Sequence, residues 1–196
     1  MTSTAPTTNT DRKRWTGPNG LLNTRYHKPA LLLFLFVVVA HWVEHLAQAY
    51  QIYVLDWARP KAGGALGLAF PKLVTSEWLH YGFAIVMLVA FVMLRHGFVG
   101  RARTWWNVAM WIQVWHHFEH LLLLLQAITG AHLMGKPMVT SIAQLIFPRV
   151  ELHLFYNAIV FVPMVIAMVL HMRPRAHELE LMRCTCATRV PAGAAA

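Results

Sequence analysis

Four stretches of the chain are almost continuously apolar, and shorter segments with more polar residues separate them. They cover residues 29–53, 74–94, 104–128 and 150–172. Each stretch is close to the ~20 residues that an α-helix needs to cross a hydrocarbon core about 30 Å thick. The pattern therefore predicts an all-α integral membrane protein in which four transmembrane helices form a bundle.

The rest of the chain divides around this transmembrane domain, which we expect to cover residues 29–173. Residues 1–28 are polar and basic and are expected to form a flexible arm, and residues 174–196 form a tail that ends in a low-complexity run. The composition agrees with a membrane protein, because 57% of the residues are hydrophobic and only 13% are charged. Soluble domains have about 25% charged residues.

The placement of positive charge predicts the orientation. Twelve of the 17 Lys and Arg residues lie in the arm, in the loop after the second apolar stretch and in the tail. Positive residues accumulate on the cytoplasmic side of membrane proteins, so both termini are expected to be cytoplasmic in a multi-pass protein of the cell membrane. The net charge of +9 is then explained by topology and by attraction to membrane lipid, and nucleic acid is not an expected partner.

The two halves of the chain repeat each other. The sequence HWVEHL at 41–46 matches HHFEHL at 116–121, and FPKLVTSEWLHYGFAIV at 70–86 matches FPRVELHLFYNAIV at 147–160 when three residues are omitted. Each half contains two apolar stretches, so each is predicted to form one helical hairpin. Two such hairpins would have the same topology and be related by a pseudo-two-fold axis along the membrane normal.

Ionisable residues interrupt all four apolar stretches at a similar depth. At 1.5 Å of rise per residue they fall in the outer half of the membrane in each predicted helix. Within one helix, residues spaced by three and four share a face. The candidate ligands are His41, Glu44, His45, Glu77, His80, His116, Glu119, His120, Glu151 and His153. Membership of Gln48 and His117 stays open, as does that of both Glu151 and His153, which are only two positions apart.

A bound metal explains why so many ionisable groups share one layer of a membrane. Each such group is costly at membrane depth and normally has a partner. Imidazole suits Fe, Cu and Zn, and helical bundles with Glu-x-x-His motifs hold di-iron centres. We therefore predict two or more transition-metal ions, Fe or Cu ahead of Zn. The Cys184/Cys186 pair can hold a soft metal ion, although reduced surface thiols are the expectation, and His27 and His171 are expected at the membrane interface.

Three classes of function fit these features. The first is a metal-dependent membrane oxidoreductase that acts on oxygen and a lipid-soluble substrate, such as a hydrocarbon, a lipid or a quinol, with a partner subunit as electron donor. The second is an electron-transfer subunit that holds haem b through two of the histidines. The third is a protein that transports or handles metal ions or protons, which the apolar inner halves of the predicted helices disfavour.

Overall fold

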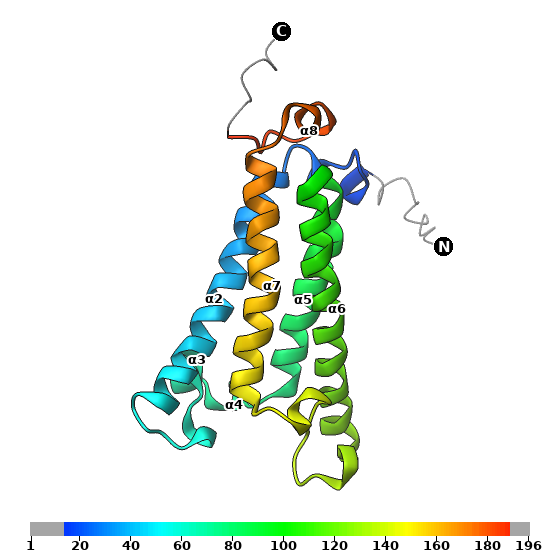
Figure 1. Cartoon of the computed structure of the whole chain (residues 1–196). Coiled ribbons are helices and arrows are strands. Elements are labelled where there is room, and N and C mark those ends of the chain that lie inside the picture. Colours follow the sequence, from blue (N-terminus) through cyan, green and yellow to red (C-terminus); the bar gives the residue numbers. More distant parts are fainter. Residues whose placement is uncertain (1–13, 189–196) are drawn as a thin grey trace, which may run out of the picture. The chain divides into compact units, whose positions relative to one another are not determined.

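The computed structural model describes residues 14–188, which contain helices and turns and no β-strand. Residues 1–13 of the predicted arm and 189–196 of the predicted tail lie outside the described residues. Figure 1 shows the elements in chain order. The four longest helices are α2 (His27–Tyr53), α5 (Glu77–Leu94), α6 (Gly100–Thr129) and α7 (Arg149–Met172). The all-helical prediction is confirmed for the described part of the chain.

Short elements connect the long helices. They are η1 (Leu21–Asn23), η2 (Arg59–Lys61), α3 (Gly64–Ala69), α4 (Pro71–Val74), η3 (Arg95–Gly97), η4 (Leu133–Gly135), η5 (Ala143–Leu145) and α8 (Ala176–Leu181). The predicted stretch at 74–94 is divided, because α4 ends at Val74 and α5 begins at Glu77. Proline at its first position starts α4, and an acidic residue in the first turn favours the start of α5.

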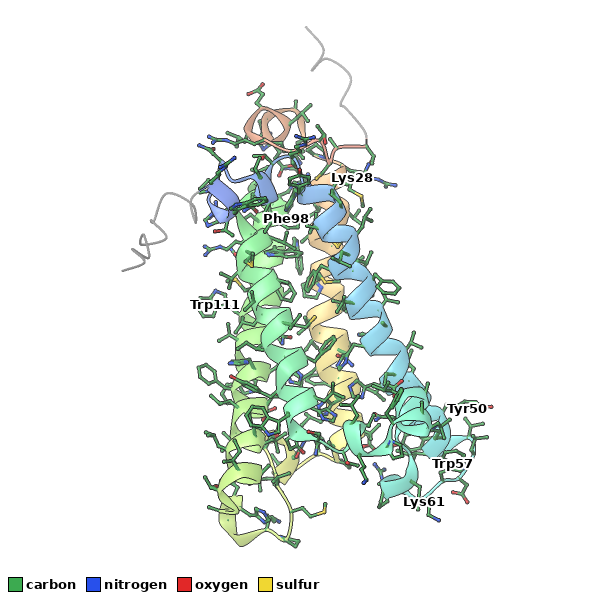
Figure 2. All side chains as sticks on the ribbon, turned by 180° about the vertical axis from the view of Figure 1, so that it is seen from behind. Lys28, Tyr50, Trp57, Lys61, Phe98 and Trp111 are labelled. Atoms are coloured by element: carbon green, nitrogen blue, oxygen red, sulfur yellow. The ribbon has the colours of Figure 1, made fainter. Side chains whose placement is uncertain are left out.

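Three of the helical segments among the described residues are long and apolar enough to cross a membrane. They are His27–Tyr53, Glu77–Gly97 and Arg149–Met172. In the first of these, only 22% of the most apolar window is buried, so most of its apolar side chains face outward, as lipid-facing side chains do. Helix α6 is longer but more polar. It still presents large apolar side chains outward, including Trp111, which is 66% exposed (Figure 2).

The chain divides into two compact units, and every long helix contributes to both. The first unit comprises Met1–Phe34, Ala90–Asn107 and Pro163–Ala196, and the second comprises Leu35–Val89 and Val108–Val162. Each unit therefore contains sections of α2, α5, α6 and α7. All the candidate ligands predicted from the sequence belong to the second unit.

Aromatic side chains form the core of the first unit. Phe98 stacks on Trp106 with ring centroids 4.2 Å apart, and Phe34 meets Phe91 edge to face at 5.1 Å. The indole Nε1–H of Trp106 donates to the carbonyl oxygen of Phe91 at 2.9 Å. This bond satisfies the polar atom of a fully buried tryptophan, so the core has the packing expected of a rigid scaffold.

Helix α8 is fastened within the first unit by one carboxylate. Glu178 accepts hydrogen bonds from the backbone N–H of Arg101 at 3.0 Å and of Arg175 at 2.9 Å, and it pairs with the Arg101 guanidinium at 3.0 Å. The Arg101 side chain, followed by these backbone donors, lowers the pKa of Glu178 to about 2. Gly100 allows this close approach, because a Cβ there would lie 2.5 Å from the carboxylate.

Candidate metal centre

Six imidazoles from four helices gather in the second unit. Helix α2 supplies His41 and His45, α5 supplies His80, α6 supplies His116 and His120, and α7 supplies His153. We call these residues the histidine cluster. Four of its rings are 8% exposed or less, while His41 and His80 are partly exposed. All six are residues that the sequence pattern singled out as candidate ligands.

Two pairs within the histidine cluster have the same geometry. The Nε2 atoms of His41 and His45 are 3.2 Å apart, and so are those of His116 and His120. Each pair is spaced by four residues, which brings its two rings together, edge to face, on one side of the helix. Two imidazoles bound to one ion at 2.0–2.1 Å in tetrahedral geometry have nitrogen atoms about 3.3 Å apart. The Nε2 separation in each pair is thus close to that of two ligands on one ion. A hydrogen bond between two imidazoles gives a similar separation.

The second ring nitrogen sets the tautomer in three members of the cluster. Nδ1–H of His153 donates to the carbonyl oxygen of Arg149 at 2.7 Å, and that of His80 donates to Ser76 at 3.0 Å. In His45, Nδ1 bonds the side-chain oxygen of Gln48 at 2.8 Å. Each bond leaves Nε2 without a proton and oriented by its partner. Metal-ligating histidines are commonly held in this way.

His153 lies at the meeting point of the other rings. Its ring centroid is 5.0 Å from that of His45, 5.2 Å from His120, 5.6 Å from His116 and 6.2 Å from His80. Together with His116 and His120 it forms a group whose potential ligand atoms all lie within 4.8 Å of one another. The cluster thus joins histidines of all four long helices.

Several nitrogen atoms of the cluster are buried without a partner. Among residues 14–188, no hydrogen-bond partner is found for Nε2 of His153 or for Nδ1 of His116 and His120. A buried polar atom without a partner costs about 1–3 kcal/mol, and such atoms in proteins are normally satisfied by water or an ion. The excess of ring nitrogens over hydrogen bonds therefore indicates a site for an additional ligand.

The four candidate carboxylates are engaged elsewhere in the second unit. Glu77 forms a bidentate ion pair with Arg149, with both N···O distances 2.7 Å. Glu151 is bound by Arg59 at 2.6 and 2.9 Å and also by the hydroxyl of Tyr53. Of Glu151 and His153, which are two positions apart on α7, His153 therefore lies in the histidine cluster and Glu151 forms an ion pair outside it.

The other two carboxylates hold loops against their helices. Glu44 accepts from the backbone N–H of Leu66 at 2.8 Å and of Ala65 at 3.2 Å. Gly64, with φ +73°, makes this possible, because a Cβ there would lie 2.2 Å from the Glu44 carboxylate. Glu119 accepts from the backbone N–H of Ala143 at 2.8 Å. Each of these glutamates lies one position before a cluster histidine and holds a short connecting helix, α3 or η5, against its own helix.

The two residues whose membership the sequence left open have different positions. Gln48 bonds His45 and so orients a cluster ring. The ring of His117 packs against Tyr81, with centroids 5.3 Å apart, and it belongs to neither group of potential metal ligands found in residues 14–188. Its 100° rotation from the shared helical face explains this placement.

A small cavity lies among the cluster rings. It measures about 20 Å³, which is enough for about one water molecule or a similarly small ligand. It is lined by His41, His80, His116, His120, Gln113, Asn157, Phe83, Ala84 and Met87. The buried Nδ2 of Asn157 has no hydrogen-bond partner among residues 14–188. The cavity therefore offers a free donor beside the imidazoles.

A larger groove approaches the cluster from one side. It measures about 380 Å³ and includes side chains of α2 and α5. Its lining is Phe36, Val37, Ala40, His41, Glu44, His45, Gln48, Leu66, Val74, Leu79, His80 and Phe83. We call it the α2/α5 groove. Because most of this lining is apolar and three cluster histidines form part of it, the groove suits an apolar molecule whose one end meets the imidazoles.

A second group of potential metal ligands was missed by the sequence reasoning. It consists of His27, His171, Cys184 and Cys186, all in the first unit. The predicted surface position is wrong for Cys186, which is 2% exposed, and His27 and His171 are also buried. The one available signal was the Cys-x-Cys sequence.

Comparison of the chain with protein-family models, curated proteins and solved structures finds no match.

Proposed function

We propose that the histidine cluster is a transition-metal centre within a membrane and that the protein is an oxidoreductase acting on oxygen and a lipid-soluble substrate. The observation that carries this proposal is the position of His153. Its Nδ1–H is fixed by a backbone carbonyl, and its buried Nε2 has no partner in residues 14–188 although rings of three other helices surround it. An ion would satisfy this nitrogen and draw the neighbouring imidazoles together.

The contacts of the glutamates sharpen the ligand set. Because all four carboxylates have protein partners, we propose that imidazoles supply the protein ligands and that the glutamates position loops and ion pairs. Six imidazoles exceed the needs of one ion, so we propose two, Fe or Cu. An ion of either element would supply electron transfer and oxygen chemistry when bound.

The residues around the cluster would divide the remaining tasks. The α2/α5 groove would bind an apolar chain from the lipid side, with Phe36 and Phe83 as contacts and His41 and His80 at its polar end. The small cavity would hold a small ligand beside Asn157, whose amide is free to donate. Apolar walls would exclude bulk water from both. Electrons would come from a partner membrane subunit or from a quinol.

The proposal includes a four-helix transmembrane bundle built from two duplicated hairpins, with both termini cytoplasmic. Two observations support the duplication. The His41/His45 and His116/His120 pairs have equal Nε2 separations of 3.2 Å, and His80 and His153 each bond the carbonyl four residues earlier. The polar α6 would then cross the membrane because its histidines face the other helices, which lowers the cost of burying them.

Haem electron transfer is the competing function for the same histidines. As the rings stand, they enclose about 20 Å³, so a porphyrin would require them to separate. The α2/α5 groove is large enough for part of a haem, but it contains rings of α2 and α5 alone. Metal ions held directly by imidazole therefore fit the arrangement better.

The test is metal analysis of detergent-purified protein by mass spectrometry, together with its optical spectrum. We expect about two Fe or Cu ions per chain and no Soret band. His153→Ala should remove at least half of this metal. His117→Ala is the matched control, because it removes an imidazole from the same region that is not in the cluster, and it should keep the full content. A Soret band, or unchanged metal in the His153 variant, would overturn the proposal.

A further inference from the structure

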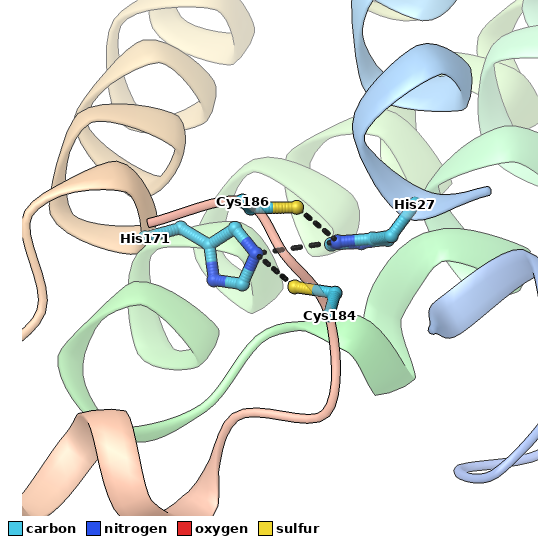
Figure 3. A group of neighbouring side chains, drawn as sticks. All are labelled: His27, His171, Cys184 and Cys186. Atoms are coloured by element: carbon cyan, nitrogen blue, oxygen red, sulfur yellow. Dashed lines mark hydrogen bonds between the residues drawn. The ribbon is translucent and has the colours of Figure 1, made fainter. Parts of the chain in front are cut away.

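Four potential ligand side chains converge in the first unit from distant parts of the sequence. His27 begins α2, His171 is near the end of α7, and Cys184 and Cys186 follow α8. Figure 3 shows the two imidazoles and the two thiols turned toward one another. Their potential ligand atoms all lie within 4.8 Å of one another. We call these residues the Cys/His cluster.

The individual distances describe a site for one ion. The His171 Nε2 atom is 3.2 Å from Nδ1 of His27 and 3.2 Å from Sγ of Cys184, and Sγ of Cys186 is 3.4 Å from Nδ1 of His27. Tetrahedral zinc with its usual bond lengths to nitrogen and sulfur spaces its ligand atoms about 3.3–3.8 Å apart. These three pairs of atoms would need to move apart by only a few tenths of an ångström, and all the potential ligand atoms already lie within 4.8 Å of one another. A two-iron cluster, with thiolates on one iron and imidazoles on the other, would separate sulfur from nitrogen much further.

Burial shields most of the site from solvent. His27 and His171 are at most 1% exposed, Cys186 is 2% exposed, and Cys184 is partly buried. The aromatic ring of Phe98 flanks both imidazoles, with centroids 5.1 Å from His27 and 4.7 Å from His171. Four protein ligands and no open position are the pattern of a structural zinc site rather than of a catalytic one.

Surrounding groups hold His27 in the required orientation. Its Nε2–H donates to the carbonyl oxygen of Leu94 at 3.2 Å, which leaves Nδ1 as the free, ligating nitrogen. The ring fits against Gly97, where a Cβ would lie only 2.2 Å from Nε2. Gly97 is itself fixed, because its N–H donates to the side-chain oxygen of Asn23 at 2.9 Å. Orienting bonds of this kind are a regular feature of metal-binding histidines.

The segment with the two cysteines is fastened to the end of α7. The backbone N–H and the hydroxyl of Thr188 both donate to the carbonyl oxygen of Met172, at 2.9 and 3.1 Å. These two hydrogen bonds to one carbonyl hold the segment next to Met172, the residue that follows His171. The placement of both thiols is therefore supported by the backbone as well as by the side chains.

We propose that His27, His171, Cys184 and Cys186 bind one Zn²⁺ ion, which joins the start of α2 and the end of α7 to the segment after α8. This site is independent of the proposed function of the histidine cluster. Zinc fits better than a redox metal, because two thiolates and two imidazoles in a closed tetrahedral arrangement are a common set for structural zinc. Zinc bound here would stabilise the folded form directly, because the unfolded chain has no preformed site.

The test measures zinc in full-length protein purified in detergent. We expect about one zinc per chain in the native sequence and less than a tenth of that in the Cys184→Ser/Cys186→Ser double variant. His177→Ala is the matched control, because this exposed histidine on α8 lies close in sequence but outside the cluster, and it should keep its zinc. Iron and copper, measured on the same samples, should not change in either variant.

Cobalt provides a second measurement that needs no variant. Removing zinc with a chelator and adding Co²⁺ to the native protein should produce the visible bands of tetrahedral cobalt and a thiolate charge-transfer band. Zinc retained in the double variant, or a cobalt spectrum without thiolate ligation, would overturn the proposal. A loss of iron or copper with unchanged zinc would overturn it as well. Failure of the histidine cluster to bind metal would leave the zinc result unaffected.

Discussion

The two groups of potential metal ligands differ in composition and in their surroundings. The histidine cluster contains imidazoles alone, with a small cavity among the rings and an apolar groove beside them. The Cys/His cluster has two thiols and two imidazoles in a buried setting. Open coordination positions are needed for reactivity, whereas a complete protein ligand set serves structure. The difference supports the two proposals, chemistry at the first cluster and stabilisation by the second.

The largest expected effect is on the thermal unfolding midpoint, which should depend on the Cys/His cluster. Cys184→Ser/Cys186→Ser should lower the thermal unfolding midpoint of the purified protein, because the free energy of zinc binding is part of the folding free energy. A chelator should lower the midpoint of the native protein in the same way and leave the double variant unchanged. Equal midpoints for native and variant protein would show that the thiols hold no stabilising ion.

A carboxylate substitution asks whether the histidine cluster uses acidic ligands. Glu77→Gln removes the buried partner of the partly buried Glu77–Arg149 ion pair and should cost about 1–3 kcal/mol of stability, measured by denaturant unfolding. The metal content should stay at the native level. If instead metal is lost while stability is kept, Glu77 is a ligand, as the sequence pattern predicted. His80→Ala provides the comparison, because it should lose metal.

Gly97→Ala tests the orientation of His27 without removing any ligand. The new Cβ would meet the His27 ring and push Nδ1 out of position. We expect zinc to dissociate at least tenfold faster, because disturbing the orientation of a metal-binding histidine typically costs about 10- to 100-fold in metal affinity. Competition with a chromogenic chelator measures the rate. Gly82→Ala is the control, because no atom lies within 4 Å of a Cβ at that position. If Gly97→Ala releases zinc no faster than Gly82→Ala does, the result argues against the assignment of His27 as a ligand.

The smallest expected effect concerns the docking of α8. Because Arg101 and two backbone amides lower the pKa of Glu178 from its usual 4.5 to about 2, the carboxylate stabilises the folded state above pH 4.5. This contribution is lost as the pH falls from 4.5 toward 2. Limited proteolysis near α8 should therefore increase over this range. Glu178→Gln should be cleaved readily at neutral pH and show little change over the same range, and a native-like profile would contradict the role given to this carboxylate.

The long helices and all six residues of the histidine cluster could be predicted from the sequence, because apolar runs and spacings of three and four are local signals. The roles of the glutamates could not. Glu44 binds backbone amides of α3, Glu119 binds one of η5, and Glu77 pairs with an arginine 72 positions away in the sequence. The Cys/His cluster was also beyond local patterns, since Cys186 and His27 are separated by 159 positions. Only the fold brings together ligands that no motif connects.

X-ray absorption at the edge of each bound metal tests most directly whether the protein has two chemically distinct metal sites. We expect sulfur and nitrogen neighbours at the zinc edge, and nitrogen neighbours without sulfur at the iron or copper edge. We also expect His153→Ala to change the second spectrum and to leave the zinc spectrum as it was. Sulfur ligands on iron or copper, or a zinc spectrum without sulfur, would contradict the presence of two distinct sites.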